Sequence, residues 1–234
     1  MTQVFREKKD HTSSSSFRKY LSLHWEEIFF LALFSLLSFQ VVFFVSDTKS
    51  ILGSNGGAVA AFASFESFIL TTASYITLPL IVVPLVCLVL YHSRSPWVRR
   101  YLDFAGIYIA ARMLIQLVGL NLLVFDRDSP RFALITQLLF FLPYSLLIWG
   151  WIYWRLDTFA SAEHRRYFRL DCERENPRPI DYLVASFSSV FSASISAIKG
   201  RSARARMLII IHGFVVYDIM GLTLSRAVAL IQSK

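Results

Sequence analysis

Charged residues are scarce in this chain of 234 residues. They make up 17% of the sequence, against about a quarter in a typical soluble domain. Hydrophobic residues make up 55%, which excludes a long disordered chain because disorder requires low hydrophobicity. The apolar residues fall in blocks of about 20, long enough to cross a bilayer core of roughly 30 Å. The sequence therefore predicts an all-α, polytopic integral membrane protein.

Cysteines and catalytic motifs are also scarce. Cys87 and Cys172 are the two cysteines, and neither has a CxxC neighbour, so we expect neither a disulfide framework nor a metal site. The sequence contains no HExxH zinc-protease motif and no GxSxG nucleophile motif. The GSNGG run at residues 53–57 follows no predicted strand, so it does not indicate nucleotide binding. We expect no enzymatic activity and no cofactor.

Length and hydropathy predict five membrane spans. The first apolar block starts near Ile28 and is too long for the apolar region of a signal peptide, so residues 1–27 are interpreted as a basic, polar N-terminal tail. The fourth block ends in WGWIYW, which is typical of an aromatic belt at the membrane interface. The predicted spans are 28–45, 68–91 (with Pro79 and Pro84 inside), 104–125, 132–154 and 207–231.

Residues 180–198 (IDYLVASFSSVFSASISAI) are apolar enough to enter a membrane, yet they carry six serines. A basic stretch follows, with Lys199, Arg201, Arg204 and Arg206 and no acid among them. A segment this polar is more often a re-entrant or interfacial helix than a lipid-exposed span. We expect a re-entrant helix, with a full crossing and a surface helix as the alternatives.

The sequence of this segment and of the span that follows resembles the pore module of the potassium channel superfamily. Residues 181–226 read DYLVASFSSVFSASISAIKGRSARARMLIIIHGFVVYDIMGLTLSR. Bacterial members of that superfamily typically read like DYLYFSFVTLTTVGYGDIVP, then LARML after a short turn, then an inner helix that ends in IAR. The matching positions are Asp181, Tyr182, Leu183, Ser186, Phe187, Ile198, Ser202, Ala205, Arg206, Met207, Leu208 and Arg226.

The resemblance implies a pore module over residues 132–231, after N-terminal transmembrane helices over 28–125. Such modules are fourfold assemblies, so it also implies a homo-oligomer, by resemblance a tetramer. The segment equivalent to the TVGYGD filter is Ser192, Ala193, Ser194, Ile195, Ser196 and Ala197. Potassium filters stack backbone carbonyls, and their glycines adopt positive φ cheaply. Ser194 and Ser196 take the two glycine positions, so the sequence predicts a degenerate, glycine-free filter.

We therefore expect an ion-channel-like protein that is either non-selective or non-conducting. If it conducts monovalent ions, Ser192, Ser194 and Ser196 would form a hydroxyl-lined constriction, with Ile195 as a hydrophobic gate. The main alternative is a non-conducting membrane scaffold or accessory subunit that keeps the helices and has lost the pore. A transporter with Arg112 and Asp218 near the midplane is a weaker alternative.

The basic residues are distributed unevenly between the two sides of the predicted spans. With a cytoplasmic N-terminus and five spans, 18 of the 24 Lys and Arg residues lie inside and four lie outside. The positive-inside rule favours this orientation, although it places the pore-like loop on the cytoplasmic side, opposite to a potassium channel. An additional helix within 51–67 would restore the usual orientation, but little room remains for it before the span at 68–91.

Arg112, Asp218 and His212 are ionisable side chains inside predicted spans whose roles can be weighed. Arg112 is either a functional charge, such as an anion, lipid or sensor contact, or a structural partner of an acid such as Asp218; we expect the structural pair. Asp218 shares a helix face with Gly221 and Ser225, and it faces either a cavity or a partner helix. His212 lies on another side of the same helix. The Tyr217–Asp218 pair resembles half of an intramembrane aspartyl protease motif, but that chemistry requires two carboxylates, and no second acid lies in a predicted span.

The sequence pI is about 9.7, and the basic clusters flank the predicted spans instead of lying on a soluble domain. Anionic lipid headgroups attract such clusters by about 1 kcal/mol per Lys or Arg. We therefore expect the lipid bilayer, and not nucleic acid, as the partner of these residues. The expected location is a bacterial inner (plasma) membrane.

Overall fold

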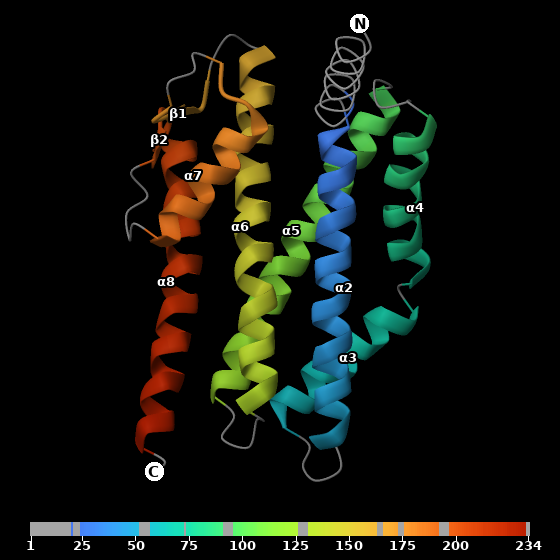
Figure 1. Cartoon of the computed structure of the whole chain (residues 1–234), viewed down its shortest axis with the longest axis vertical. Coiled ribbons are helices and arrows are strands. Elements are labelled where there is room, and N and C mark those ends of the chain that lie inside the picture. The colour runs from blue at the N-terminus through green and yellow to red at the C-terminus, as the bar shows by residue number, and fades with distance from the viewer. Residues whose placement is uncertain are drawn as a thin grey trace, which may run out of the picture.

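The structure, a computed structural model, describes Tyr20 and residues 24–51, 57–72, 74–90, 96–125, 131–162, 166–172, 176–191 and 197–232. Nearly all of these residues are helical, so the all-α prediction is confirmed. Figure 1 shows the helices arranged lengthwise as a bundle, with one two-stranded ladder at its upper end. The elements are α2 (Trp25–Ile51), α3 (Ala58–Thr72), α4 (Ser74–Leu90), α5 (Pro96–Phe125), α6 (Arg131–Ala162), β1 (Phe168–Leu170), α7 (Pro179–Phe191), β2 (Ile198–Gly200) and α8 (Ala203–Gln232).

Four described helices, α2, α5, α6 and α8, are long and apolar enough to cross a membrane. They contain 27, 30, 32 and 30 residues, which at 1.5 Å per residue gives lengths of about 40 to 48 Å. Each exceeds the hydrocarbon core of roughly 30 Å. The prediction of a polytopic membrane protein is therefore supported by four helices of the required length.

The span predicted over 68–91 is wrong as a single helix. The structure has α3 ending at Thr72 and α4 beginning at Ser74, and residues 58–67, which were expected to precede the span, form most of α3. In Figure 1, α3 runs obliquely at the lower end of α2, and α4 runs beside its upper part.

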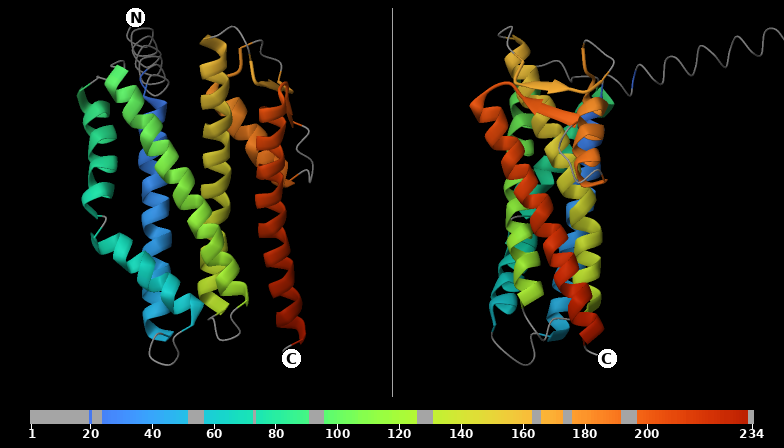
Figure 2. Two further views of the ribbon diagram at one scale, coloured as in Figure 1. Left: turned by 180° about the vertical axis from the view of Figure 1, so that it is seen from behind. Right: turned by 90° about the vertical axis from the view of Figure 1, so that its left-hand side faces the viewer.

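Three of the four long helices run in one direction, and one runs in the opposite direction. In Figures 1 and 2, α2, α5 and α8 run from the upper to the lower end, and α6 runs upward. The start of α5, the end of α6, both strands and the start of α8 therefore lie at one end of the molecule. Ten of the 14 described Lys and Arg residues lie in these elements or in the segments that join them. The charge asymmetry of the sequence is thus an asymmetry between the two ends of the bundle.

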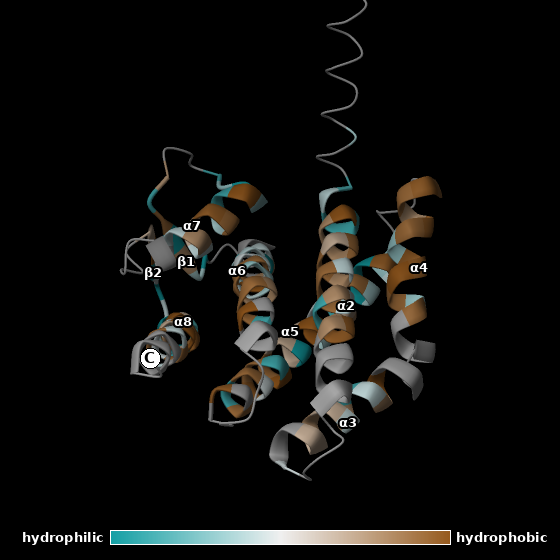
Figure 3. Cartoon of the chain, turned by 60° about the horizontal axis from the view of Figure 1, so that its bottom comes forward, coloured by the Kyte–Doolittle hydropathy of each residue, from teal (hydrophilic) through white to brown (hydrophobic). Residues whose placement is uncertain are grey.

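The interior of the bundle is packed by large side chains from α2, α5 and α6. Phe30, Phe141 and Tyr144 are fully buried, and the Phe30 ring meets the edge of Trp151 with centroids 5.5 Å apart. Gly106 permits this packing, because a Cβ there would lie 2.0 Å from the Trp151 ring. Small residues allow such close approach between membrane helices, where van der Waals packing dominates association. Outward-facing residues are largely apolar, as the brown surface of α4 shows in Figure 3.

Candidate functional site

The short helix α7 packs against the long helix α6. It contains 13 residues and descends from the upper end of α6 toward α8 (Figures 1 and 2). Its start carries clear sequence signals, because Pro179 takes the first helical position and the Asp181 carboxylate accepts a hydrogen bond from the Arg178 amide at 2.6 Å. This is the acidic half of a capping box. The helix therefore begins where its local sequence predicts.

The two strands hold together the chain segments on either side of α7. They pair antiparallel, with Phe168 opposite Gly200 and Leu170 opposite Ile198. The ladder is extended at one end by a hydrogen bond from the Asp171 amide to the Ala197 carbonyl at 3.0 Å. Residues 171 and 197 are therefore neighbours in space. The intervening segment, which includes α7, leaves and returns to the same end of the bundle.

Close packing and hydrogen bonds fix α7 against α6. The Ser186 hydroxyl donates to the Leu146 carbonyl at 2.8 Å. Gly150 leaves room for Leu183, since a Cβ at position 150 would lie 2.5 Å from Leu183 Cδ2 and 2.9 Å from its Cα. A glycine on α6 thus allows the backbone of α7 to approach closely.

Asp157 connects α6, β1 and α7 through one buried carboxylate. Its Oδ1 accepts hydrogen bonds from the amides of Tyr167 at 2.8 Å and Phe168 at 3.0 Å. Its Oδ2 accepts the Tyr182 hydroxyl at 2.5 Å. Burial, and then the hydrogen bond to Asp157, raises the pKa of Tyr182 above its ordinary value, so the phenol stays protonated as a donor. In the sequence, the signal for Asp157 is its position at the end of WIYWRLD, directly after the aromatic residues.

Most of the predicted filter segment lies outside the described residues. This applies to Ser192, Ala193, Ser194, Ile195 and Ser196. Ala197 is described: it is half-buried, and its carbonyl accepts the Asp171 amide. The resemblance aligns Ala197 with the filter aspartate. In the structure, the backbone of Ala197 extends the β1–β2 pair by one hydrogen bond.

Arg112 forms a buried ion pair, but with a different acid from the one suggested by the sequence. Its guanidinium donates to Glu66 Oε1 at 3.1 Å and to Oε2 at 2.5 Å. Glu66 is 0% exposed and the Arg112 side chain 5%, so the pair is bidentate and isolated from the surface. This geometry agrees with the expectation that Arg112 belongs to a structural ion pair. The suggestion of Asp218 as its acidic partner was wrong. Glu66 was missed because residues 58–67 had not been predicted as helix.

Asp218 lies against a neighbouring helix. Its carboxylate accepts a hydrogen bond from Asn121 of α5 at 2.9 Å, and the side chain is half-buried. Glu66 is a second buried acid of the bundle, but its carboxylate pairs with Arg112 and not with Asp218. The two carboxylates have separate partners, which does not match the shared site that aspartyl protease chemistry requires.

His212 is fully buried between α8 and α6. One ring nitrogen, Nδ1, lies 2.8 Å from the Tyr153 hydroxyl, and the ring stacks on Trp149 with centroids 4.7 Å apart. Near Arg112, a separate amide contact joins two other helices: Gln40 Nε2 donates to Gln116 Oε1 at 3.3 Å. Both contacts use polar atoms inside the bundle to connect helices, as intramembrane polar residues commonly do.

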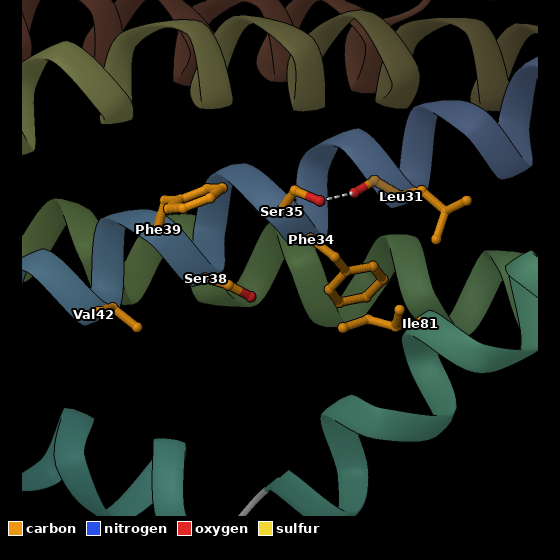
Figure 4. Close-up of a pocket in the computed structure, with 7 residues that line it drawn as sticks. All are labelled: Leu31, Phe34, Ser35, Ser38, Phe39, Val42 and Ile81. Atoms are coloured by element: carbon orange, nitrogen blue, oxygen red, sulfur yellow. Dashed lines mark hydrogen bonds between the residues drawn. The ribbon is translucent and has the colours of Figure 1, made fainter.

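A groove on the outer side of α2 has no reactive group. It has a volume of about 310 Å³ and is shown in Figure 4. The Ser35 hydroxyl on its wall donates to the Leu31 carbonyl at 2.8 Å, as Figure 4 also shows. The other lining residues are Phe34, Ser38, Phe39, Val42 and Ile81. Its mostly apolar lining matches a surface that faces acyl chains.

No group of three or more His, Cys, Asp or Glu side chains suited to a metal ion occurs within the described ranges. Comparisons of the chain with protein-family models, curated proteins and solved structures find no match. The likeness of residues 181–226 to a potassium channel pore module therefore stays a prediction. The geometry of α6, α7 and α8 is the basis on which function can be argued.

Proposed function

We propose that this chain is an ion-channel-like membrane protein in which α6, α7 and α8 form a pore-type module. In this proposal α6 is the outer helix, α7 is a re-entrant pore helix and α8 is the inner helix. The glycine-free segment 192–197 takes the place of a selectivity filter. The N-terminal helices α2 to α4 lie on the other side of α6 (Figure 1), and α5 packs against both α6 and α8.

The observation that carries this proposal is the pairing of β1 with β2. It brings residues 171 and 197 together, so the chain that contains α7 enters and leaves at one end. With 13 residues, α7 is about 20 Å long, which is too short to cross a hydrocarbon core of roughly 30 Å. A short helix followed by irregular backbone is tolerated at membrane depth where protein surrounds it. Helix α6, which packs closely against α7, is part of the protein that surrounds it.

The membrane topology in this proposal has five crossings. Four are the long helices, and the fifth is the α3–α4 pair, which together follow the length of α2 in Figure 1. The N-terminus and the basic end, which also carries α7, then lie on the cytoplasmic side of a bacterial inner membrane. The pore-type module is inverted relative to a potassium channel in this arrangement.

The exposure of α8 supports a homo-oligomer. Phe214 is 72% exposed and Tyr217 is 63% exposed, and a Cβ built at Gly221 meets nothing within 4 Å. One copy of an inner helix cannot enclose a pore, whereas a tetramer can bring four together. The uncovered face of α8, with its small Gly221, provides a surface on which neighbouring copies could pack.

The second candidate is a non-conducting scaffold, and the filter sequence itself favours it. Ser194 and Ser196 replace the two glycines, and serine adopts positive φ only with strain. Hydroxyl rings also lack the rigid carbonyl cage that selects potassium. A transporter is less favoured, because Arg112 is neutralised by Glu66 and Asp218 is bonded to Asn121.

Ion flux from proteoliposomes separates the two candidates. The full chain is reconstituted, and efflux of K⁺ and of Na⁺ is compared for wild type, Ser194→Trp and Phe104→Trp. Phe104 is 57% exposed on α5, so its replacement adds the same bulky ring away from the module. A conducting pore predicts flux in wild type and Phe104→Trp and a loss of flux in Ser194→Trp. Absence of flux from all three, with protein correctly inserted, supports the scaffold and rejects conduction.

A further inference from the structure

The β1–β2 pair places two basic side chains directly opposite each other. Arg169 and Lys199 are Cα partners in the antiparallel register, and both are exposed. The residues that alternate with them, Phe168 and Ile198, are each 2% exposed and pack into the core. Like charges directly opposite on two strands destabilise the pair. The ladder therefore presents two cations side by side on its outer face, at an electrostatic cost.

Among the described residues, neither Arg169 nor Lys199 forms an ion pair. The ion pairs formed there involve other basic groups, namely His24, Arg99, Arg112 and Arg155. Asp171, which follows β1, is one acid close to two cations and forms no ion pair with either. An external anion between Arg169 and Lys199 would relieve the repulsion. It would also receive charge-assisted hydrogen bonds, which are about twice as strong as neutral ones.

The two cations line a hollow that can hold such an anion. Its volume is about 270 Å³, and its walls are Arg169, Leu170, Asp171, Cys172 and Lys199. Arginine presents a planar fork suited to phosphate oxygens, and lysine supplies a point charge. Asp171 also lines the hollow, and an aspartate can accept a hydrogen bond from a hydroxyl group attached to that phosphate. The lining thus suits a phosphate that carries a polar substituent.

With the apolar run of α8 inside the hydrocarbon core, the hollow lies at the depth of lipid headgroups. Strand β2 ends at Gly200 and α8 begins at Ala203, and the apolar run of α8 starts at Met207. Four helical residues span about 6 Å, which matches the thickness of roughly 5 to 8 Å that headgroups add on each side of the hydrocarbon core. Arg201, Arg204 and Arg206 lie in the same stretch. A phosphate at this level belongs to the bilayer surface.

We propose that the outer face of the β1–β2 pair binds the phosphodiester of an anionic phospholipid, with Arg169 and Lys199 as its ligands. The bound headgroup neutralises the cross-strand repulsion and thereby stabilises the ladder that closes the α7 segment. The inference requires a membrane-embedded chain, but it does not depend on whether that chain conducts ions. The lipid-binding experiment can therefore reject this inference without bearing on ion flux, and the flux experiment can reject conduction without bearing on lipid binding.

The test uses the purified full chain in detergent, titrated with phosphatidylglycerol or with phosphatidylcholine. A ligand that binds only the folded state stabilises it by RT ln(1 + [L]/Kd), and so raises the melting temperature more when it binds more tightly. Phosphatidylglycerol is expected to raise it, and phosphatidylcholine much less. The double variant Arg169→Gln/Lys199→Gln should bind phosphatidylglycerol about ten to thirty times more weakly, from the loss of two charges at the membrane surface. The matched control is Arg100→Gln/Arg178→Gln, which removes two exposed arginines that do not line the hollow and should change binding less than threefold.

A charge-reversal variant distinguishes loss of the lipid site from unfolding of the protein. Lys199→Glu places an acid opposite Arg169 and converts cross-strand repulsion into attraction. The lipid-free melting temperature should then stay the same or rise, while phosphatidylglycerol binding is lost. Equal weakening in the control pair, or retained binding in Lys199→Glu, would overturn the assignment. Full competition by inorganic phosphate at the lipid's own concentration would also overturn it, because the site would then recognise free phosphate.

Discussion

Replacing Glu66 with glutamine removes the negative partner of Arg112 and preserves the shape of the side chain. Both groups are buried in the bundle, with Glu66 0% exposed and the Arg112 side chain 5%. Breaking a buried pair by removing one partner typically costs about 3 to 5 kcal/mol, because the remaining charge is uncompensated. Glutamine still offers one oxygen to the guanidinium, so we expect the lower value, a loss of about 3 kcal/mol in the free energy of unfolding.

The measurement is unfolding of the full chain in mixed micelles with an increasing fraction of sodium dodecyl sulfate, followed by helical circular dichroism. Arg100→Gln is the control, since Arg100 is an exposed arginine, and a surface change should stay within about 0.5 kcal/mol. The double variant Glu66→Gln/Arg112→Met removes both charges. Replacing a whole buried pair with neutral groups is often close to neutral, so the double variant should recover most of the loss.

Two results would refute this reasoning. A loss below about 1 kcal/mol in Glu66→Gln would mean that the pair does not stabilise the contact between α3 and α5. A double variant whose loss equals the sum of the two single losses would show no coupling between the residues. Either result would leave Arg112 available for a functional role.

Two further predictions concern the packing of α7 and the orientation of the bundle. Gly150→Leu should lower the free energy of unfolding by about 1 to 3 kcal/mol, since overpacking forces Leu183 from its position. Phe104→Trp adds bulk to an exposed side chain of α5 and should not lower it. Similar effects of both in the micelle titration would contradict the close approach of α7. In a variant with both native cysteines replaced, Ala203→Cys should react with a membrane-impermeant maleimide only in inverted vesicles, and Gly57→Cys only in right-side-out ones. The reverse pattern would place the basic end outside the cell.

Four of the spans were predictable because a long apolar run is a local property. The expected segments 28–45, 104–125, 132–154 and 207–231 fall within α2, α5, α6 and α8. The helices extend further than the hydropathy pattern, and α5 begins at Pro96 and not at residue 104. Hydropathy detects only the part of a helix inside hydrocarbon, while its ends continue among headgroups with polar side chains such as Arg99.

The division between α3 and α4 was harder to predict. The proline pair at 79 and 84 indicated a kinked helix and not a break, because membrane helices often tolerate proline. This error also explains why Glu66 was missed. An acid assigned to a loop is expected to be solvated, so no buried partner was sought for it. An alanine-rich run with one acid, AVAAFASFES, is the signal that could have revealed α3.

The candidate site was partly visible in the sequence. Pro179 and Asp181 mark the start of α7, and the serines at 186–196 suggested that the segment would not cross the membrane. Asp157 was not singled out, because its importance depends on the Tyr182 hydroxyl and on two amides of the β1 region. Those partners lie 10 to 25 positions away along the chain.

By itself, the sequence determined the helical class, the membrane environment, most of the long helices and the accumulation of basic charge on one side. These follow from composition and from patterns within about 20 residues, which fix local solvation energy. Only the tertiary structure decided that Arg112 pairs with Glu66, that Asp157 joins three elements, and that β1 meets β2 and so returns the α7 segment to its starting end. Those pairings join residues far apart in the chain, and their choice depends on which helix faces come into contact when the bundle packs.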